Sequence, residues 1–197
     1  MPNPKTLGVL LIEGFADWEY PLLAASACEW FGIGVRFLTP GGSAVTSIAG
    51  LRFADGAAFE KEDAGSLDAL AVIGSEVWSS DAAPDIGNAL HTHLAAGAIV
   101  GGICAGTVPL ARAGLFEGRA HTSNGRDWLL KATGGYDGSG GYRDVPHAIA
   151  DGPVVSAPGS APGTFACAML AAMMPEAGEQ VAGMRAMFAR EYEQGAG

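Results

Sequence analysis

Residues 98–107 read Ala-Ile-Val-Gly-Gly-Ile-Cys-Ala-Gly-Thr, and this stretch decides the fold. The apolar run before the cysteine predicts a buried strand, and residues 108–113 predict a helix. Cys104 lies between them, where enzymes with a G-x-S-x-G motif place their serine on a sharp strand-to-helix turn. Gly102 and Gly106 flank the cysteine, and without side chains they allow strand and helix to approach closely. The stretch therefore predicts a nucleophile elbow.

A second interpretation is a structural cysteine buried in a Gly-rich strand, because cysteine is among the residues most often buried. The order of strand, glycine, cysteine and helix favours the elbow, since the motif requires that structural context. In an elbow, the first N–H groups of the following helix point at the sulfur and favour the thiolate. We therefore expect a lowered pKa for the Cys104 thiol.

The composition is that of a globular protein with a substantial core. The chain has 197 residues, of which 49% are hydrophobic and 16% charged. We expect a single domain over residues 1–197. A net charge of −10, without a cluster of Lys or Arg, argues against nucleic acid or an anionic membrane as a partner. Gly and Pro interrupt the long uncharged stretches at residues 94–111 and 153–175, which favours buried strand–helix units over membrane spans.

The N-terminus and the cysteines indicate the compartment. Residues 1–6 carry no basic segment before a long apolar core, as a secretory signal would. The three cysteines form neither a metal-ligand spacing nor a disulfide framework. We therefore expect a cytoplasmic protein with free thiols, no metal and no cofactor.

Strand and helix patterns alternate along the chain, with no break in composition. Strands are expected at residues 7–12, 35–38, 44–48, 51–54, 67–73, 99–103, 145–149 and 154–157. Helices are expected at residues 17–31, 84–96, 108–113, 125–132, 162–173 and 178–192. Asp17 is the expected N-cap of the first helix, and Gly32 its expected end. This alternation predicts one α/β domain with a mostly parallel sheet.

Ligands of such sheets bind beyond the carboxyl ends of the strands. The first strand runs into residues 13–19, which include Glu19. The strand at residues 67–73 ends at Gly74-Ser75, and the next one leads to Cys104. The predicted sheet can therefore bring a carboxylate, backbone N–H groups and a thiol to one point.

These motifs together resemble the DJ-one/ThiJ/PfpI superfamily, whose fold is shared with class I glutamine amidotransferases. The resemblance spans about residues 5 to 175. It rests on Gly-Phe-Ala-Asp-Trp-Glu at 14–19, Gly74-Ser75, Cys104-Ala105-Gly106, Gly-Arg-Ala-His-Thr-Ser-Asn at 118–124, and Asp151-Gly152. It implies a flavodoxin-like three-layer sandwich. It also implies that Glu19 hydrogen-bonds Cys104, and that Gly74, Ser75 and Ala105 form an oxyanion pocket.

Histidine is where the chain departs from the family. The family's competent members often carry a histidine after the elbow helix, and by spacing that position is Ser123. His121 lies two residues earlier, and His147 lies on a later predicted strand. We favour His121 as the base, with Ser123 and His147 as further pocket residues. The chain has no late His-x-Glu, which argues against glutamine amidotransfer.

The chemistry expected of Glu19 follows from its surroundings. A carboxyl beside a thiol in a partly buried pocket has a raised pKa and can donate its proton to the thiolate. The alternative is an exposed glutamate in the first turn of a helix, favoured by the helix dipole. Ser75, in place of a family glycine, can narrow the oxyanion pocket or donate its hydroxyl. Trp78 either walls the pocket or packs in the core, and Cys28 and Cys167 are expected in the core.

The predicted function is cysteine-dependent chemistry on a small electrophile, with Cys104 as nucleophile and Glu19 as proton shuttle. The resemblance implies hydration or hydrolysis of the glyoxalase or deglycase type. Two alternatives stay open: an isonitrile-hydratase-like or peptidase-like hydrolase, and a non-enzymatic oxidative-stress sensor or chaperone-like protein that uses oxidation of Cys104. The expected partners are a small-molecule substrate and a second copy of the chain, because two-fold dimers are the commonest oligomers.

Overall fold

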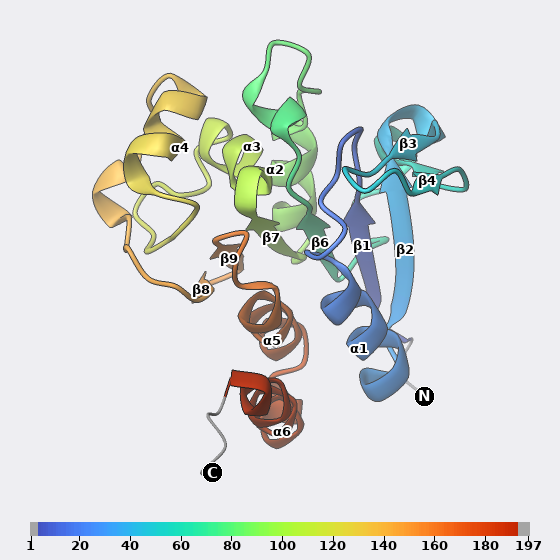
Figure 1. The fold of residues 1–197 in the computed structure, drawn as a ribbon. Coiled ribbons are helices and arrows are strands. Elements are labelled where there is room, and N and C mark those ends of the chain that lie inside the picture. The colour runs from blue at the N-terminus through green and yellow to red at the C-terminus, as the bar shows by residue number, and fades with distance from the viewer. Residues whose placement is uncertain (1–3, 193–197) are drawn as a thin grey trace.

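The computed structural model describes residues 4–192, and within them the sheet has seven strands (Figure 1). They are ordered β5-β2-β1-β6-β7-β9-β8. Their bounds are β1 Thr6–Leu10, β2 Gly34–Thr39, β5 Ala57–Ala58, β6 Ala69–Val72, β7 Ile99–Ile103, β8 Ile149–Asp151 and β9 Val154–Ala157. Every neighbouring pair is parallel except β8 with β9. The predicted α/β fold with a mostly parallel sheet is confirmed.

Helices cover both faces of this sheet, which makes three layers (Figure 1). One face carries α1 (Pro21–Phe31), α5 (Pro162–Met173) and α6 (Gly178–Ala189), and the other carries α2 (Gly87–Ala95) and α3 (Thr107–Arg112), with α4 (Arg126–Thr133) beside α3. Side chains along a strand alternate between faces. In β1, Leu7 and Val9 accordingly join the apolar cluster under α1 and α5, while Leu10 joins the cluster under α2 and α3.

The order of the strands decides where a ligand can bind. After β1 the chain first forms β2 on one side, and later forms β6 on the other side. This reversal leaves a crevice at the carboxyl ends of the adjacent strands, which is the usual ligand site of open α/β sheets. The segments that follow β1, β6 and β7 all begin at this edge.

Several predicted elements have the observed bounds, namely the strands at 99–103 and 154–157 and the helix at 162–173. The short strands expected at residues 44–48 and 51–54 are also present, as β3 (Val45–Thr46) paired antiparallel with β4 (Arg52–Phe53). Gly32 ends α1 in the left-handed conformation, as expected. None of the helices within residues 4–192 has the length and apolarity required to cross a bilayer.

Two expectations are corrected. The first helix begins at Pro21 and not at Asp17, because the Asp17 carboxylate accepts the backbone N–H of Ala49 and so fixes the β3–β4 loop instead of capping α1. The strand expected at residues 145–149 is an irregular segment, and β8 begins only at Ile149. Pro146 lies inside that segment, and proline cannot donate to a β-ladder.

Candidate active site

Cys104 occupies a strained turn between β7 and α3. Its φ of 56° makes it the only non-glycine residue with a positive φ in the described part of the chain. A Cβ on Gly102 would lie 2.6 Å from the Gly106 carbonyl oxygen, and a Cβ on Gly106 would lie 2.1 Å from the carbonyl oxygen of Val72. Strand, turn and helix are therefore packed backbone to backbone, which is the geometry predicted for an elbow.

Glu19 reaches the turn from the segment after β1. Its side chain is fully buried, which excludes the alternative of an exposed first-turn glutamate. The backbone N–H of Gly74, at the end of β6, donates to its Oε2 at 2.6 Å. The other oxygen, Oε1, is buried and has no hydrogen-bond partner of regular geometry among residues 4–192. This oxygen is free to exchange a proton with the neighbouring sulfur.

Two glycines make room for the carboxyl and the thiol. A Cβ on Gly74 would lie 2.6 Å from Glu19 Oε2 and 2.8 Å from the Cys104 Cβ. A Cβ on Gly159, after β9, would lie 2.8 Å from the Cys104 Sγ and 3.3 Å from Glu19 Oε1. The carboxyl and the thiol thus share a space that exists because two facing residues lack side chains.

Burial raises the pKa of the Glu19 carboxyl from 4.5 to about 7, against the hydrogen bonds with Gly74 and Cys104, which lower it. Burial, and next the charge of Glu19, raise the pKa of the Cys104 thiol to about 11. This corrects the predicted low pKa of the Cys104 thiol. That prediction rested on the helix N-terminus and left out the desolvation of the thiol by burial. The repulsion acts only while Glu19 is ionised, so the pair is best described as sharing one negative charge.

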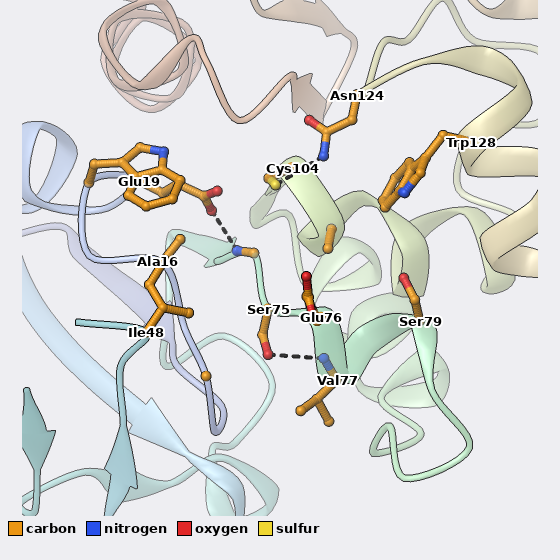
Figure 2. Close-up of a pocket in the computed structure, with 14 residues that line it drawn as sticks. Ala16, Glu19, Ile48, Ser75, Glu76, Val77, Ser79, Cys104, Asn124 and Trp128 are labelled. Carbon is orange, nitrogen blue, oxygen red and sulfur yellow. Dashed lines mark hydrogen bonds between the residues drawn. The ribbon is translucent and has the colours of Figure 1, made fainter. Parts of the chain in front are cut away.

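Asn124 binds the sulfur on the side opposite Glu19 (Figure 2). Its Nδ2 donates to the Cys104 Sγ at 3.0 Å, and its Oδ1 accepts the Gly159 N–H at 2.9 Å. Because a backbone N–H can only donate, the second bond fixes the amide so that its NH₂ group faces the sulfur. This donor favours the thiolate and lowers the Cys104 pKa.

Asn124 belongs to the sequence motif at 118–124, but no role was predicted for it. It lies directly after Ser123, the position that spacing had assigned to a family histidine. The motif therefore did contain the residue that lies beside the sulfur, one position after the residue that the spacing selected. In this chain an amide, which does not titrate in water, occupies the place beside the sulfur.

His121, the expected base, is not at this site. Its Nδ1 lies 3.0 Å from the Arg119 carbonyl oxygen, and its Nε2 lies 2.8 Å from the hydroxyl of Tyr136. The ring stacks on Phe116 with centroids 4.2 Å apart, and burial lowers its pKa. Both ring nitrogens are engaged inside an aromatic cluster, which corrects the placement of His121 beside Cys104.

Three other expected pocket residues also lie elsewhere. Trp78 is fully buried in the core, where its indole N–H donates to the Ile73 carbonyl oxygen at 2.8 Å. The Ser123 hydroxyl pairs with that of Thr107 at 2.6 Å. His147 is exposed and lines a separate cavity of about 300 Å³ beside α5 and α6.

Gly74, Ser75 and Ala105 do line the cavity at Cys104. The Gly74 N–H is occupied by Glu19, but the Ser75 N–H has no acceptor among residues 4–192. The Ser75 hydroxyl donates to the Glu13 carbonyl oxygen at 2.6 Å and accepts the Val77 N–H, so it points away from the sulfur (Figure 2). The Ala105 N–H follows Cys104 directly and lowers the pKa of its thiol. The N–H groups of Ser75 and Ala105 are therefore the candidate backbone donors of the oxyanion pocket.

The cavity above Cys104 has a volume of about 690 Å³. Its walls are largely apolar and come from the loops after β1, β3 and β6 and from α4. The large side chains that line it include Trp18, Ile48, Glu76 and Trp128. Among residues 4–192 no group of three or more His, Cys, Asp or Glu side chains is arranged to hold a metal ion.

The remaining two cysteines differ from one another. Cys167 is buried, as expected. Cys28 is exposed, which corrects its assignment to the core. It follows Ala27, the last buried residue of α1, and one further residue turns the side chain about 100° around the helix axis, away from the sheet.

The comparisons with known proteins agree with this geometry. A family model described as the DJ-1/PfpI family matches residues 5–172. The chain belongs to the DJ-1/PfpI family. Among curated proteins, the "uncharacterized protease YoaZ" of Bacillus subtilis is 29% identical over 162 residues, which are 79% of this chain and 77% of that protein.

Solved structures of the family superpose closely on this chain. A DJ-1 superfamily protein from Agrobacterium tumefaciens has a TM-score of 0.86 at 35% identity, and the match covers 96% of this chain and 100% of that one. A ThiJ/PfpI family protein from Bacillus anthracis has a TM-score of 0.78 at 27% identity, with 86% and 83% covered. The flavodoxin-like family fold implied by the resemblance is therefore confirmed.

We expect Gly106→Ala to destabilise this family fold strongly. The added Cβ would meet the Val72 carbonyl oxygen at 2.1 Å, and β6 cannot yield without breaking the sheet, so we expect a loss of about 3 kcal/mol. The control is Gly183→Ala in α6, where a Cβ meets nothing within 4 Å and should be neutral or stabilising. Urea unfolding measures both variants, and equal stability of the two would contradict the tight elbow.

Glu19→Gln should stabilise the protein at alkaline pH. The pKa of Glu19 is about 7 in the folded protein, against the ordinary value of 4.5 that applies in the unfolded chain. The folded state therefore binds this proton more tightly than the unfolded state does. The free energy of unfolding therefore falls as the pH rises from 4.5 to 7. Gln carries no charge, and we expect a gain of about 3 kcal/mol at pH 8 and little change at pH 4.

Urea unfolding at the two pH values tests this expectation, with Glu76→Gln as control, since Glu76 is an exposed carboxyl of the same cavity. A variant that is less stable than the parent at pH 8 would mean that the Gly74 N–H compensates the buried charge fully.

Proposed function

We propose that this protein is a cysteine-dependent enzyme that hydrates small reactive carbonyl compounds, in the manner of a glyoxalase or deglycase. The observation that carries the proposal is the buried pair of the Cys104 thiol and the Glu19 carboxyl. With a pKa of about 7, Glu19 is matched to proton transfer near neutral pH, where a general base works best. No histidine is required beside it.

In the first step, the Glu19 carboxylate takes the thiol proton while the Cys104 sulfur attacks the aldehyde carbon of a 1,2-dicarbonyl compound. The carbonyl oxygen gains the electron pair, and the Ser75 and Ala105 N–H groups are positioned to stabilise it. Glu19 then returns the proton to this oxygen. The product of the step is a neutral hemithioacetal, with no net change in oxidation state.

The second step moves the proton of the former aldehyde C–H bond, through Glu19, to the adjacent carbonyl carbon. The hemithioacetal hydroxyl gives its proton to the adjacent carbonyl oxygen, so that the first oxygen becomes the thioester carbonyl and the second becomes a hydroxyl. The electron pair of the broken C–H bond passes along the two-carbon unit, so one carbon is oxidised to a thioester and its neighbour is reduced to an alcohol. Water then cleaves the thioester to a 2-hydroxy acid and regenerates the thiol. The net reaction is the addition of one water molecule, with no external oxidant or reductant.

Asn124 supports both steps without transferring a proton. Its fixed NH₂ group donates to the sulfur at 3.0 Å, which offsets part of the cost of forming a thiolate in a buried place. It also leaves Glu19 as the titratable group that carries the proton. We assign Asn124 as a positioning residue and Glu19 as the proton shuttle.

A peptidase-like hydrolase is the second candidate, because the Bacillus subtilis relative is named a protease. An amide leaving group requires a general acid in addition to the base. Among the described residues lining the cavity no histidine is present, so Glu19 would have to serve in both roles. The sensor alternative requires a thiolate that peroxide can oxidise, whereas in the proposed hydration Glu19 takes the thiol proton only as the sulfur attacks. Both arguments favour carbonyl hydration over these two alternatives.

Turnover of methylglyoxal or phenylglyoxal to the 2-hydroxy acid tests the proposal. Cys104→Ser should abolish it, and Glu19→Gln should lower kcat by about 10² to 10⁴. Because Glu19 must be ionised to accept the thiol proton, kcat/KM should rise with pH through about 7, and Glu19→Gln should lack this inflection. His147→Ala is the control and should match the parent, since His147 lies outside the cavity. Peptide cleavage without dicarbonyl turnover would overturn the proposal.

We also infer a homodimer, from three exposed apolar side chains, two of which line the cavity. Trp18, Ile48 and Leu51 are 53%, 55% and 51% exposed, and large exposed apolar side chains that gather together mark interaction surfaces. Sedimentation equilibrium should give about 40 kDa, twice the chain mass of 20.0 kDa. Leu51→Asp should shift this to the monomer, and Met187→Asp at a distant exposed position is the control. A monomeric parent would contradict the inference.

A further inference from the structure

The charge of the cavity bears on which electrophiles can reach Cys104. Its ionisable lining side chains, within the described residues, are the acids Glu19 and Glu76 and the Cys104 thiol; Lys, Arg and His are missing from this lining. Glu76 is exposed and follows β6 directly, and Figure 2 shows it around the same space as Cys104 and Trp128. The whole chain carries a net charge of −10. A bound anion would therefore meet negative charge and no cation.

The hydrogen-bond donors of the cavity do not compensate for the missing cations. The Asn124 NH₂ group is directed at the sulfur, and the Gly74 N–H is used by Glu19. The Ser75 and Ala105 N–H groups lie beside the reacting atom and serve the reacting oxygen. Glu19 Oε1, which is buried without a regular partner, is an acceptor when ionised. The Ser79 hydroxyl and the Trp128 indole N–H, which also line the cavity, are neutral donors. The described lining therefore holds no cation that would neutralise a carboxylate on the substrate.

The walls of the cavity are suited to an apolar group. Trp18 is 53% exposed, yet it is held in place by the bond from its indole N–H to the Gly159 carbonyl oxygen at 3.0 Å. Trp128, on α4, lines the same cavity. Indole rings stack on planar groups and attract cations. A volume of about 690 Å³ also exceeds what an aldehyde of two or three carbons fills, because such cavities accept drug-sized ligands.

We propose that this cavity selects neutral or positively charged carbonyl electrophiles that carry an aromatic group, and rejects anionic ones such as 2-oxo acids. Glu76 supplies the discrimination by charge, and Trp128 supplies the affinity for aromatic groups. The inference rests on the proposed function in one respect only, that Cys104 is the attacking atom.

Alkylation of Cys104 measures the charge selection without any turnover. Iodoacetamide is neutral and iodoacetate is anionic, and each forms one S–C bond as iodide leaves and the thiol loses its proton. We use the ratio of the iodoacetamide rate constant to the iodoacetate rate constant. At one cysteine this ratio does not depend on the fraction of thiolate, because both reagents react with the same thiolate. Mass spectrometry of the peptides gives this ratio for Cys104 and, as an internal reference, for the exposed Cys28. We expect this ratio to be at least about fivefold larger at Cys104 than at Cys28.

Glu76→Lys should bring the Cys104 ratio down to that of Cys28 or below. Glu117→Lys is the matched control, because Glu117 is exposed, lies outside the lining of the cavity and makes the same change in net charge. It should leave the ratio as in the parent. A ratio equal to that of Cys28 in the parent, or one that responds equally to both substitutions, would overturn the charge selection.

A third reagent, N-phenyl-iodoacetamide, tests the aromatic wall. Relative to iodoacetamide, and normalised to free N-acetylcysteine, it should react several-fold faster at Cys104. Trp128→Ala should remove this preference, whereas Trp30→Ala should retain it, since Trp30 is 43% exposed and lies outside the cavity. Loss of the preference in both variants, or its absence in the parent, would overturn the aromatic selection.

The two proposals can fail separately. Selective alkylation of Cys104 without turnover of any dicarbonyl would overturn the proposed function and support the selectivity of the cavity. Turnover of methylglyoxal and phenylglyoxal with equal kcat/KM, together with unselective alkylation, would support the proposed function and overturn this inference.

Discussion

The buried carboxyl of Glu19 lies beside the half-buried thiol of Cys104. Burial penalises a charge on either group, so the pKa of the carboxyl rises to about 7 and that of the thiol to about 11. One negative charge is then shared by two atoms from distant parts of the chain. The N–H of Gly74 and the NH₂ of Asn124 each stabilise this charge from one side. The proposed chemistry depends on this shared charge, because it makes the pair both a base and a nucleophile.

The parallel sheet makes this contact possible. Glu19, Gly74 and Cys104 follow β1, β6 and β7, which are neighbours in the sheet although separate in the chain. The elbow can hold Cys104 at a φ of 56° because its flanking glycines pack directly on the backbone of β6 and α3. Such strain persists only where the surrounding structure fixes it. The core on both sides of the sheet therefore supports the geometry of a single side chain.

His121 has a structural role in this protein. His121 stacks on Phe116, bonds Tyr136 and stands edge-on to Tyr142, and Tyr142 in turn donates to the Ser123 carbonyl oxygen. This cluster fixes the Gly-rich segment at 134–141 against the segment that carries Asn124. His121 in this cluster supports the segment that carries Asn124, and in the proposed mechanism the proton transfer is left to Glu19.

The sequence by itself determined the elements whose pattern is local. The strands at 99–103 and 154–157 and the helix at 162–173 are confirmed with the predicted bounds, because periodicity and flanking glycine or proline are enough to define them. The turn at Cys104 was readable for the same reason, since Gly102 and Gly106 are needed wherever backbones touch. The motif resemblance also identified Glu19 correctly as the neighbour of the sulfur.

Only the tertiary structure decided which polar residue faces the thiol. The Ser123 hydroxyl pairs with Thr107, whereas the Asn124 amide donates to the Cys104 sulfur. One step along the chain therefore changes a buried hydroxyl into the group that binds the sulfur. A spacing argument with an error of one residue therefore selects the wrong group. The pKa of the thiol could likewise not be predicted from the sequence. The helix N-terminus that lowers this pKa is a local feature. The burial that raises it comes from the packing of the segments after β1, β6 and β9 around one sulfur atom.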